Sequence, residues 1–173
     1  NDPYIIKLQP VVIQKVLETR KRFNKQYHDI NIDLDAGTLS GANIGNDTVV
    51  DIEHVEGSQG DDIIKGNASN NILNGNAGDD TLYGGDGNDD LYGGADDDTL
   101  YGGSGVDYLS GSNGNDVLFG GDDRDSMRGG NGNDTIHGEE GNDRILSDSG
   151  ADTVYGGAGD DYINTGTSNN DYA

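Results

Sequence analysis

The sequence predicts an all-β protein: a right-handed parallel β-solenoid with 18 residues per turn, preceded by a short N-terminal helix. Three observations carry this prediction. Residues 57–173 divide into thirteen consecutive nine-residue units without insertion or deletion. The eighth position is apolar or aromatic in every unit, and the sixth is Asp in eleven units and Asn in two. A short fixed period of this kind is typical of solenoids, in which each unit packs only against its neighbours.

The composition indicates that such a solenoid needs help to fold. Only 31% of the 173 residues are hydrophobic, and the formal net charge is -23, values typical of disordered chains. Residues 57–173 carry 24 acids and 4 bases, whereas residues 1–56 carry 9 acids and 6 bases. A field of this sign disfavours nucleic acid and anionic membranes as partners. The repeat is therefore where a cation is expected.

The first segment, residues 1–29, is expected to hold an amphipathic helix that begins after Pro10. Val12, Val16 and Phe23 fall near one face of it, and six of the ten bases of the chain precede residue 26. A basic helix can contact a membrane or a partner. Packing on the first turn of the solenoid is the alternative that we favour.

Residues 30–56 are expected to form irregular opening turns that shield one end of the solenoid. Ile30, Ile32 and Leu34 alternate with polar residues, which indicates a strand. A turn-rich connector, AGTLSGANIGND, follows. Val55 then stands at the eighth position of a unit that would immediately precede Gly57.

Each repeat unit is expected to contain six residues of loop and three of strand. Gly dominates the first, second and fourth positions, where a tight turn needs unusual backbone angles. The last three residues, such as Thr81-Leu82-Tyr83, form a strand whose middle side chain points inward. Two units complete one turn, so Asp80 lies over Asp98, and Asp89 over Asp107.

Stacked carboxylates repel one another unless a cation lies between them. Carboxylates and the carbonyls of Gly-rich turns are the ligands of calcium, whereas zinc prefers His or Cys, and the chain has no Cys. The odd units form a column of seven loops and the even units a column of six, which allows up to about eleven Ca²⁺ sites between loops. We expect the strongest sites from Gly84 to Asp116 and weaker ones from Gly120 to Arg128.

The units GGDGNDDLY, GGSGVDYLS, GGNGNDTIH and GGAGDDYIN resemble the nonapeptide GGxGxDxUx of the repeats-in-toxin (RTX) family. Hemolysins, adenylate cyclase toxins, serralysins and alginate epimerases carry such repeats. The resemblance covers residues 57–173. It implies a parallel β-roll that binds calcium between consecutive loops, in a protein secreted to the extracellular space by the type I secretion machinery.

The resemblance also assigns the metal ligands. The sixth-position side chains are Asp62, Asp80, Asp89, Asp98, Asp107, Asp116, Asp125, Asp134, Asp143, Asp152 and Asp161. The carbonyl ligands come from the loop glycines Gly78, Gly85, Gly87, Gly94, Gly103, Gly105, Gly114, Gly130, Gly132, Gly141, Gly157 and Gly159. Asn71 and Asn170 replace the carboxylate in two units, and Asp96 and Asp123 replace the fourth-position Gly.

The ninth positions of the odd units suggest a second function. They form an aromatic strip on one sheet: Tyr83, Tyr101, Phe119, His137 and Tyr155. A flat aromatic strip can stack on sugar rings, so a polysaccharide or a host surface is an alternative partner. A ladder that stiffens the sheet explains the same pattern and is favoured.

No catalytic constellation stands out. The three His residues are far apart in the sequence and fit no zinc motif, and the Gly-rich loops carry too many Asp residues to hold a phosphate. We therefore expect a non-catalytic calcium-binding module that folds outside the cell and supports the secretion, folding and stability of a toxin, adhesin or exoenzyme.

Overall fold

A computed structural model describes residues 29–41, 45–48 and 52–166 of the chain. This part is built of β-strands and turns and contains no helix. The predicted N-terminal helix, Asn170 and the last eighth-position residue, Tyr172, lie outside it. The fold class predicted from the repeat is confirmed for the described residues.

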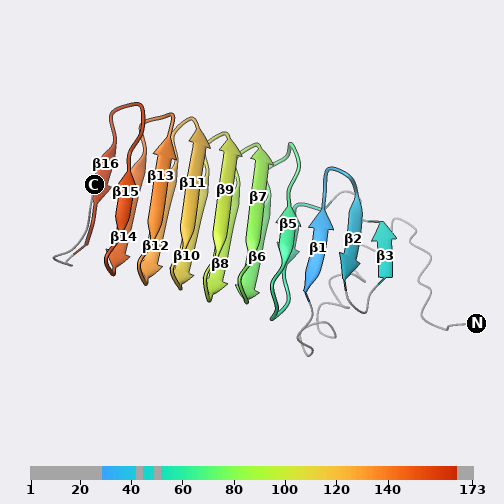
Figure 1. Cartoon of the computed structure of the whole chain (residues 1–173). Coiled ribbons are helices and arrows are strands. Elements are labelled where there is room, and N and C mark those ends of the chain that lie inside the picture. The colour runs from blue at the N-terminus through green and yellow to red at the C-terminus, as the bar shows by residue number, and fades with distance from the viewer. Residues whose placement is uncertain (1–28, 42–44, 49–51, 167–173) are drawn as a thin grey trace, which may run out of the picture.

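The strands form two sheets that face each other through the stacked turns, and one sheet extends beyond the other at its N-terminal end (Figure 1). The nine-stranded sheet runs in the order β15-β13-β11-β9-β7-β5-β1-β2-β3. Its strands are β1 (Ile30–Asp33), β2 (Thr38–Gly41), β3 (Gly45–Thr48), β5 (Ile63–Lys65), β7 (Thr81–Asp86), β9 (Thr99–Ser104), β11 (Val117–Asp122), β13 (Thr135–Glu139) and β15 (Thr153–Tyr155).

The seven-stranded sheet runs in the order β16-β14-β12-β10-β8-β6-β4. Its strands are β4 (His54–Glu56), β6 (Ile72–Ala77), β8 (Asp90–Ala95), β10 (Tyr108–Asn113), β12 (Ser126–Asn131), β14 (Arg144–Ser149) and β16 (Tyr162–Asn164). The chain crosses to the opposite sheet after each strand from β4 onward, so two units complete one turn.

The register between turns is the predicted 18 residues. Leu82 pairs with Leu100 in one sheet, and Leu91 pairs with Leu109 in the other, both in parallel strands. Side chains at the eighth position from Ile64 to Val154 are at most 1% exposed and fill the space between the sheets. Ile163, in the last described turn, is partly buried against them. The period of the apolar residues thus determines both register and core.

The strands are longer than the repeat pattern predicts. In the middle of the stack they span six residues, as in Thr81–Asp86, because they continue into the first three residues of the next unit. Gly85 pairs with Gly103 within this extension. A Cβ added to Gly103 would collide with the carbonyl of Gly85, so glycine allows these two turns to approach closely.

The opening segment is more regular than the turns expected for it. Strand β1 pairs in parallel with β5, which places Ile32 beside Ile64, and Val55 of β4 pairs with Leu73. The connector contains strands β2 and β3, which pair antiparallel with β1 and with each other. The N-terminal end of the nine-stranded sheet is therefore covered by an antiparallel extension (Figure 1).

Candidate metal sites

The sixth-position aspartates lie at the corners of the stack, where the loops enter the strands. Ten of them, Asp62 to Asp152, are at most 2% exposed, and Asp161 in the last described turn is half-buried. Burial of so many carboxylates in one small molecule is unusual, because an ionised carboxylate loses its hydration. Each carboxylate therefore requires compensating interactions.

One oxygen of each carboxylate accepts a hydrogen bond from a main-chain N–H group. The Asp80 N–H donates to Asp98 Oδ1 at 2.9 Å, and the Asp89 N–H donates to Asp107 Oδ1 at 2.8 Å. The same bond, from one sixth position to the next turn, recurs at 2.7–3.0 Å from Asp62 to Asp161. These bonds fix the orientation of the carboxylates along both corners.

The other oxygen of the carboxylate has no hydrogen-bond partner. This is so for eight buried Oδ2 atoms within the described turns, namely those of Asp80, Asp89, Asp98, Asp107, Asp116, Asp125, Asp134 and Asp143. A buried acceptor without a partner is costly, and native proteins rarely retain one unless an ion or water completes it. Eight such atoms at the same repeat position indicate a repeated ligand site.

A cradle of oxygen atoms surrounds six of these eight positions, as the loop from Gly102 to Asp107 illustrates. A Cβ built on Gly102 would lie 2.5 Å from Asp107 Oδ2 and equally close to the carbonyl oxygen of Gly120, in the next turn. Glycine at the first position therefore leaves a carboxylate and a carbonyl facing the same small space. Oxygen ligands of this kind suit a hard cation such as calcium.

The second- and fourth-position glycines predicted as carbonyl ligands share one backbone conformation. All twelve have a φ angle between 101° and 143°. A Cβ on Gly105 would meet the carbonyl oxygen of Gly87, and one on Gly132 would meet that of Gly114, so these carbonyls lie in the gaps between turns. The first-position glycines, which the sequence analysis does not name as ligands, lie closer to the carboxylates than these second- and fourth-position glycines do.

Residues that replace loop glycines also have positive φ angles. Asp96 and Asp123 at the fourth position, and Glu139 and Asp148 at the second, have φ angles of 66–77°, smaller than those of the twelve glycines. A left-handed backbone costs a residue with a side chain about 1–2 kcal/mol. These substitutions therefore strain the loops.

Burial raises the pKa of the nine sixth-position aspartates from Asp62 to Asp143 above the usual 3.8, and neighbouring carboxylates add to the effect. The pKa rises to about 8 for Asp98 and Asp125 and to about 7 for Asp80 and Asp134. Main-chain hydrogen bonds oppose the shift without cancelling it. A column of ionised aspartates is therefore unfavourable unless a cation or protons neutralise it.

Two sixth-position residues differ from the pattern. Both oxygens of Asp62 accept hydrogen bonds: Oδ1 from the Ile30 N–H at 2.7 Å and Oδ2 from the Ser58 N–H at 2.5 Å. Asp62 thus joins strand β1 to the first loop and lacks the open oxygen of the other aspartates. Asn71 presents a buried amide Nδ2 without a partner, and an amide donor does not bind a cation.

The aromatic strip proposed for glycan binding is a continuous column of stacked rings. Tyr83 stacks on Tyr101 with ring centroids 4.8 Å apart, and the contacts continue through Phe119 and His137 to Tyr155 at 4.7–4.9 Å. The interplanar angles are 3–14°. Within the column, each ring face is covered by the next ring, which fits a ladder that stiffens the sheet. Stacking on a sugar would need a ring face that is open to solvent. Glycan binding by this strip stays a prediction.

Two features of the described residues bear on other functions. No group of three or more His, Cys, Asp or Glu side chains in that part of the chain could hold a metal, so a bound ion would depend on main-chain carbonyls as well. None of the elements described is a helix long and apolar enough to cross a membrane.

Comparison with known families agrees with this geometry. The model of the RTX calcium-binding nonapeptide repeat (4 copies) matches residues 56–91, 74–109, 83–118, 101–136, 110–145, 119–154 and 137–172. Together these overlapping matches cover residues 56–172, well over half of the chain. A comparison with curated proteins finds no match.

Proposed function

Because the chain belongs to the RTX calcium-binding nonapeptide repeat family and is thus a calcium-binding module, we propose that it folds on binding Ca²⁺ outside the cell. In this proposal residues 57–173 form the β-roll, residues 30–56 its cap, and residues 1–29 a helical segment. The module itself is non-catalytic. It supports the type I secretion, folding and stability of a secreted parent protein, whether toxin, adhesin or exoenzyme.

The observation that carries the proposal is the set of eight buried Oδ2 atoms without a partner. Each faces a space that a single Cβ would fill, at a loop position held by glycine in most units. Asp80, Asp98 and Asp116 in one corner, and Asp89, Asp107 and Asp125 in the other, would supply the carboxylates. The loop glycines would supply the carbonyl ligands.

Calcium, when bound, would supply positive charge to these corners and so remove the repulsion between stacked carboxylates. The chain itself does the rest: the ladder of main-chain bonds orients each carboxylate, and the glycines keep the gap open. A ligand that binds only the folded chain stabilises it. Since each turn contacts only its neighbours, the response to calcium should be cooperative.

The test is a calcium titration of the chain followed by far-ultraviolet circular dichroism, with magnesium as the control ion. We expect a coil spectrum in chelator and a cooperative change to β-structure with calcium. Magnesium should be less effective, because it retains its own water ligands. A β-rich spectrum that is the same in chelator and in calcium would disprove the proposal.

A further inference from the structure

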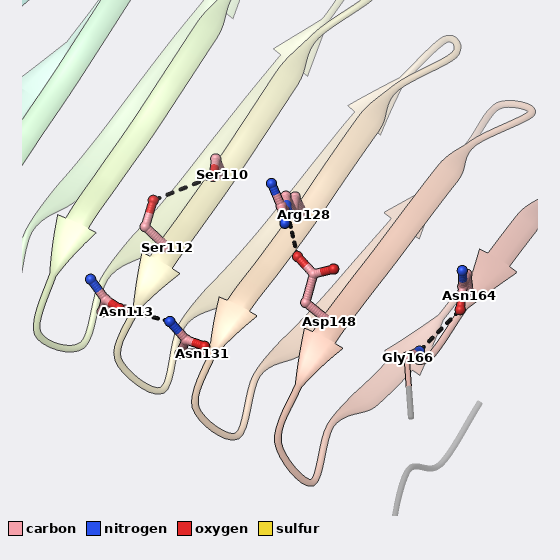
Figure 2. Close-up of polar contacts among 8 residues, drawn as sticks. All are labelled: Ser110, Ser112, Asn113, Arg128, Asn131, Asp148, Asn164 and Gly166. Atoms are coloured by element: carbon pink, nitrogen blue, oxygen red, sulfur yellow. Dashed lines mark hydrogen bonds and ion pairs between the residues drawn. The ribbon is translucent and has the colours of Figure 1, made fainter. Parts of the chain in front are cut away.

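An open groove of about 500 Å³ lies on the outer side of the seven-stranded sheet, where strands β10, β12 and β14 enter their loops. It is separate from the aromatic strip, which is on the nine-stranded sheet, and from the inward-facing aspartates. Polar side chains from neighbouring strands surround it (Figure 2). They are Ser110, Ser112, Asn113, Arg128, Asn131 and Asp148.

The hollow is produced by Gly130. This residue pairs with Ser112 on one side and with Asp148 on the other, so two polar side chains flank a position that has none. Glycine has no side chain, so this position stays open between the side chains of Ser112 and Asp148, and a Cβ on Gly130 would lie only 2.1 Å from the Ser112 carbonyl oxygen. The groove therefore depends on glycine at this position.

The groups around the hollow offer both hydrogen-bond donors and acceptors. The Ser110 and Ser112 hydroxyls lie 3.4 Å apart, and Asn131 Nδ2 donates to Asn113 Oδ1 at 2.9 Å. The Arg128 guanidinium is paired with the Asp148 carboxylate across strands β12 and β14 (Figure 2). The Arg128 side chain is 56% exposed, so donors remain free to contact a ligand.

We propose that this groove binds a neutral oligosaccharide. Hydroxyls, amides and a charged donor beside a charged acceptor match the paired hydroxyls of a sugar, and the volume falls in the range of ligand sites. An acidic chain fits less well, because the Asp148 carboxylate already pairs with the Arg128 guanidinium. The inference goes beyond calcium binding and requires only that the roll is folded.

The repeat itself suggests the variant that tests the groove. Ser110 is at the ninth position of its unit, and the paired residue on strand β8 is Tyr92. Ser110→Tyr would place a ring over the groove at a repeat position that already accepts tyrosine. Asn74→Tyr, at the same repeat position on the same sheet and also paired with Tyr92, lies outside the groove and is the matched control. Arg128→Ala removes the charged donor without filling the space.

The experiment records amide chemical shifts of the calcium-loaded, isotope-labelled chain by nuclear magnetic resonance. Cellohexaose, maltohexaose and mannohexaose are the neutral probes, and hexagalacturonate is the acidic one. We expect at least one neutral probe to shift the amides of Ser112, Gly130 and Asn131. Ser110→Tyr should abolish these shifts, Arg128→Ala should weaken binding about tenfold, and Asn74→Tyr should leave binding unchanged.

Several outcomes would overturn the proposal. They are the absence of groove shifts with every neutral probe at millimolar concentration, binding of hexagalacturonate alone, and shifts confined to the aromatic strip. Circular dichroism of each variant in calcium shows first that it is folded, so a failure here is distinct from a failure of the calcium proposal. If Ser110→Tyr does not fold, Arg128→Ala still provides the test.

Discussion

Asp97 and Asp98 are neighbours in the sequence with the same charge, yet they occupy different environments. Asp97 is exposed, and its N–H donates to Asp79 Oδ1 in the preceding turn at 3.1 Å. Asp98 is 1% exposed, and its N–H donates to Asp116 Oδ1 in the following turn at 2.9 Å. Only Asp98 has a buried oxygen without a partner. Asp98, the proposed calcium ligand, therefore differs from Asp97 in its burial and not in its charge.

The two columns connect each turn to both of its neighbours. On the outside, Asp79, Asp97 and Asn115 receive and pass on hydrogen bonds toward the N-terminal end, whereas the inner aspartates do so toward the C-terminal end. The outer column needs no ion, since its carboxylates remain in water. The comparison therefore predicts that calcium dependence resides in the inner column alone.

The largest effect is expected from replacing two inner aspartates. Asp80→Asn with Asp98→Asn removes two ligand charges from one corner, and ligand charge sets calcium affinity. We expect the calcium concentration at half-folding to rise about tenfold or more, measured by circular dichroism. The matched outer pair, Asp79→Asn with Asp97→Asn, should change it less than about twofold. If the two double variants raised the half-folding calcium concentration equally, calcium dependence would not reside in the inner column alone.

The second effect concerns pH in the absence of metal. Six inner aspartates have a pKa of about 6 to 8 when folded, against 3.8 otherwise, so the folded chain binds more protons across this range: Asp80, Asp89, Asp98, Asp116, Asp125 and Asp134. Stability is then greatest below about pH 4 and is lost as the pH rises through the folded pKa values. We expect the metal-free chain to show more β-structure at pH 5 than at pH 8.

With calcium present the dependence should reverse, because protons compete with the ion for the same oxygens. Circular dichroism of dialysed chain at the two pH values, with and without calcium, checks both signs. A metal-free chain that is more ordered at pH 8 than at pH 5 would contradict the burial of ionisable aspartates.

A smaller effect is expected from closing one cradle without removing charge. Gly102→Ala places a methyl group beside Asp107 Oδ2 and the Gly120 carbonyl, and Gly102 is not among the residues with positive φ. We expect the half-folding calcium concentration to rise about threefold, as one of several sites is lost. Ser104→Ala, two residues further along the same loop, is the control. No difference between the two variants would mean that this space holds no ion.

The sequence predicts much of this fold because the repeat period determines which residues pair between turns. A nine-residue repeat with an inward apolar residue permits little besides the pairing of Leu82 with Leu100, and it also places Tyr83 over Tyr101. The antiparallel cap was not predictable, because residues 36–47 have no period and their strand pairing depends on the end of the roll. The face-to-face stacking of the rings likewise depends on rotamers that the pattern does not determine.

For the candidate sites, the sequence identifies which oxygen-bearing residues recur but not which of their atoms are already used. Asp62 and Asp98 occupy the same repeat position, yet the cap supplies hydrogen bonds to both oxygens of Asp62. The groove around Gly130 depends on three strands at once, because the strand register places Ser112 on one side of Gly130 and Asp148 on the other. Such differences arise from neighbours that are 18 or more residues away.

The account rests on ions bound between the turns, and native mass spectrometry of the folded chain counts them directly. In calcium, we predict several Ca²⁺ per chain, gained together as the compact form replaces the extended one. A compact chain that carries no more than one calcium ion would contradict the account.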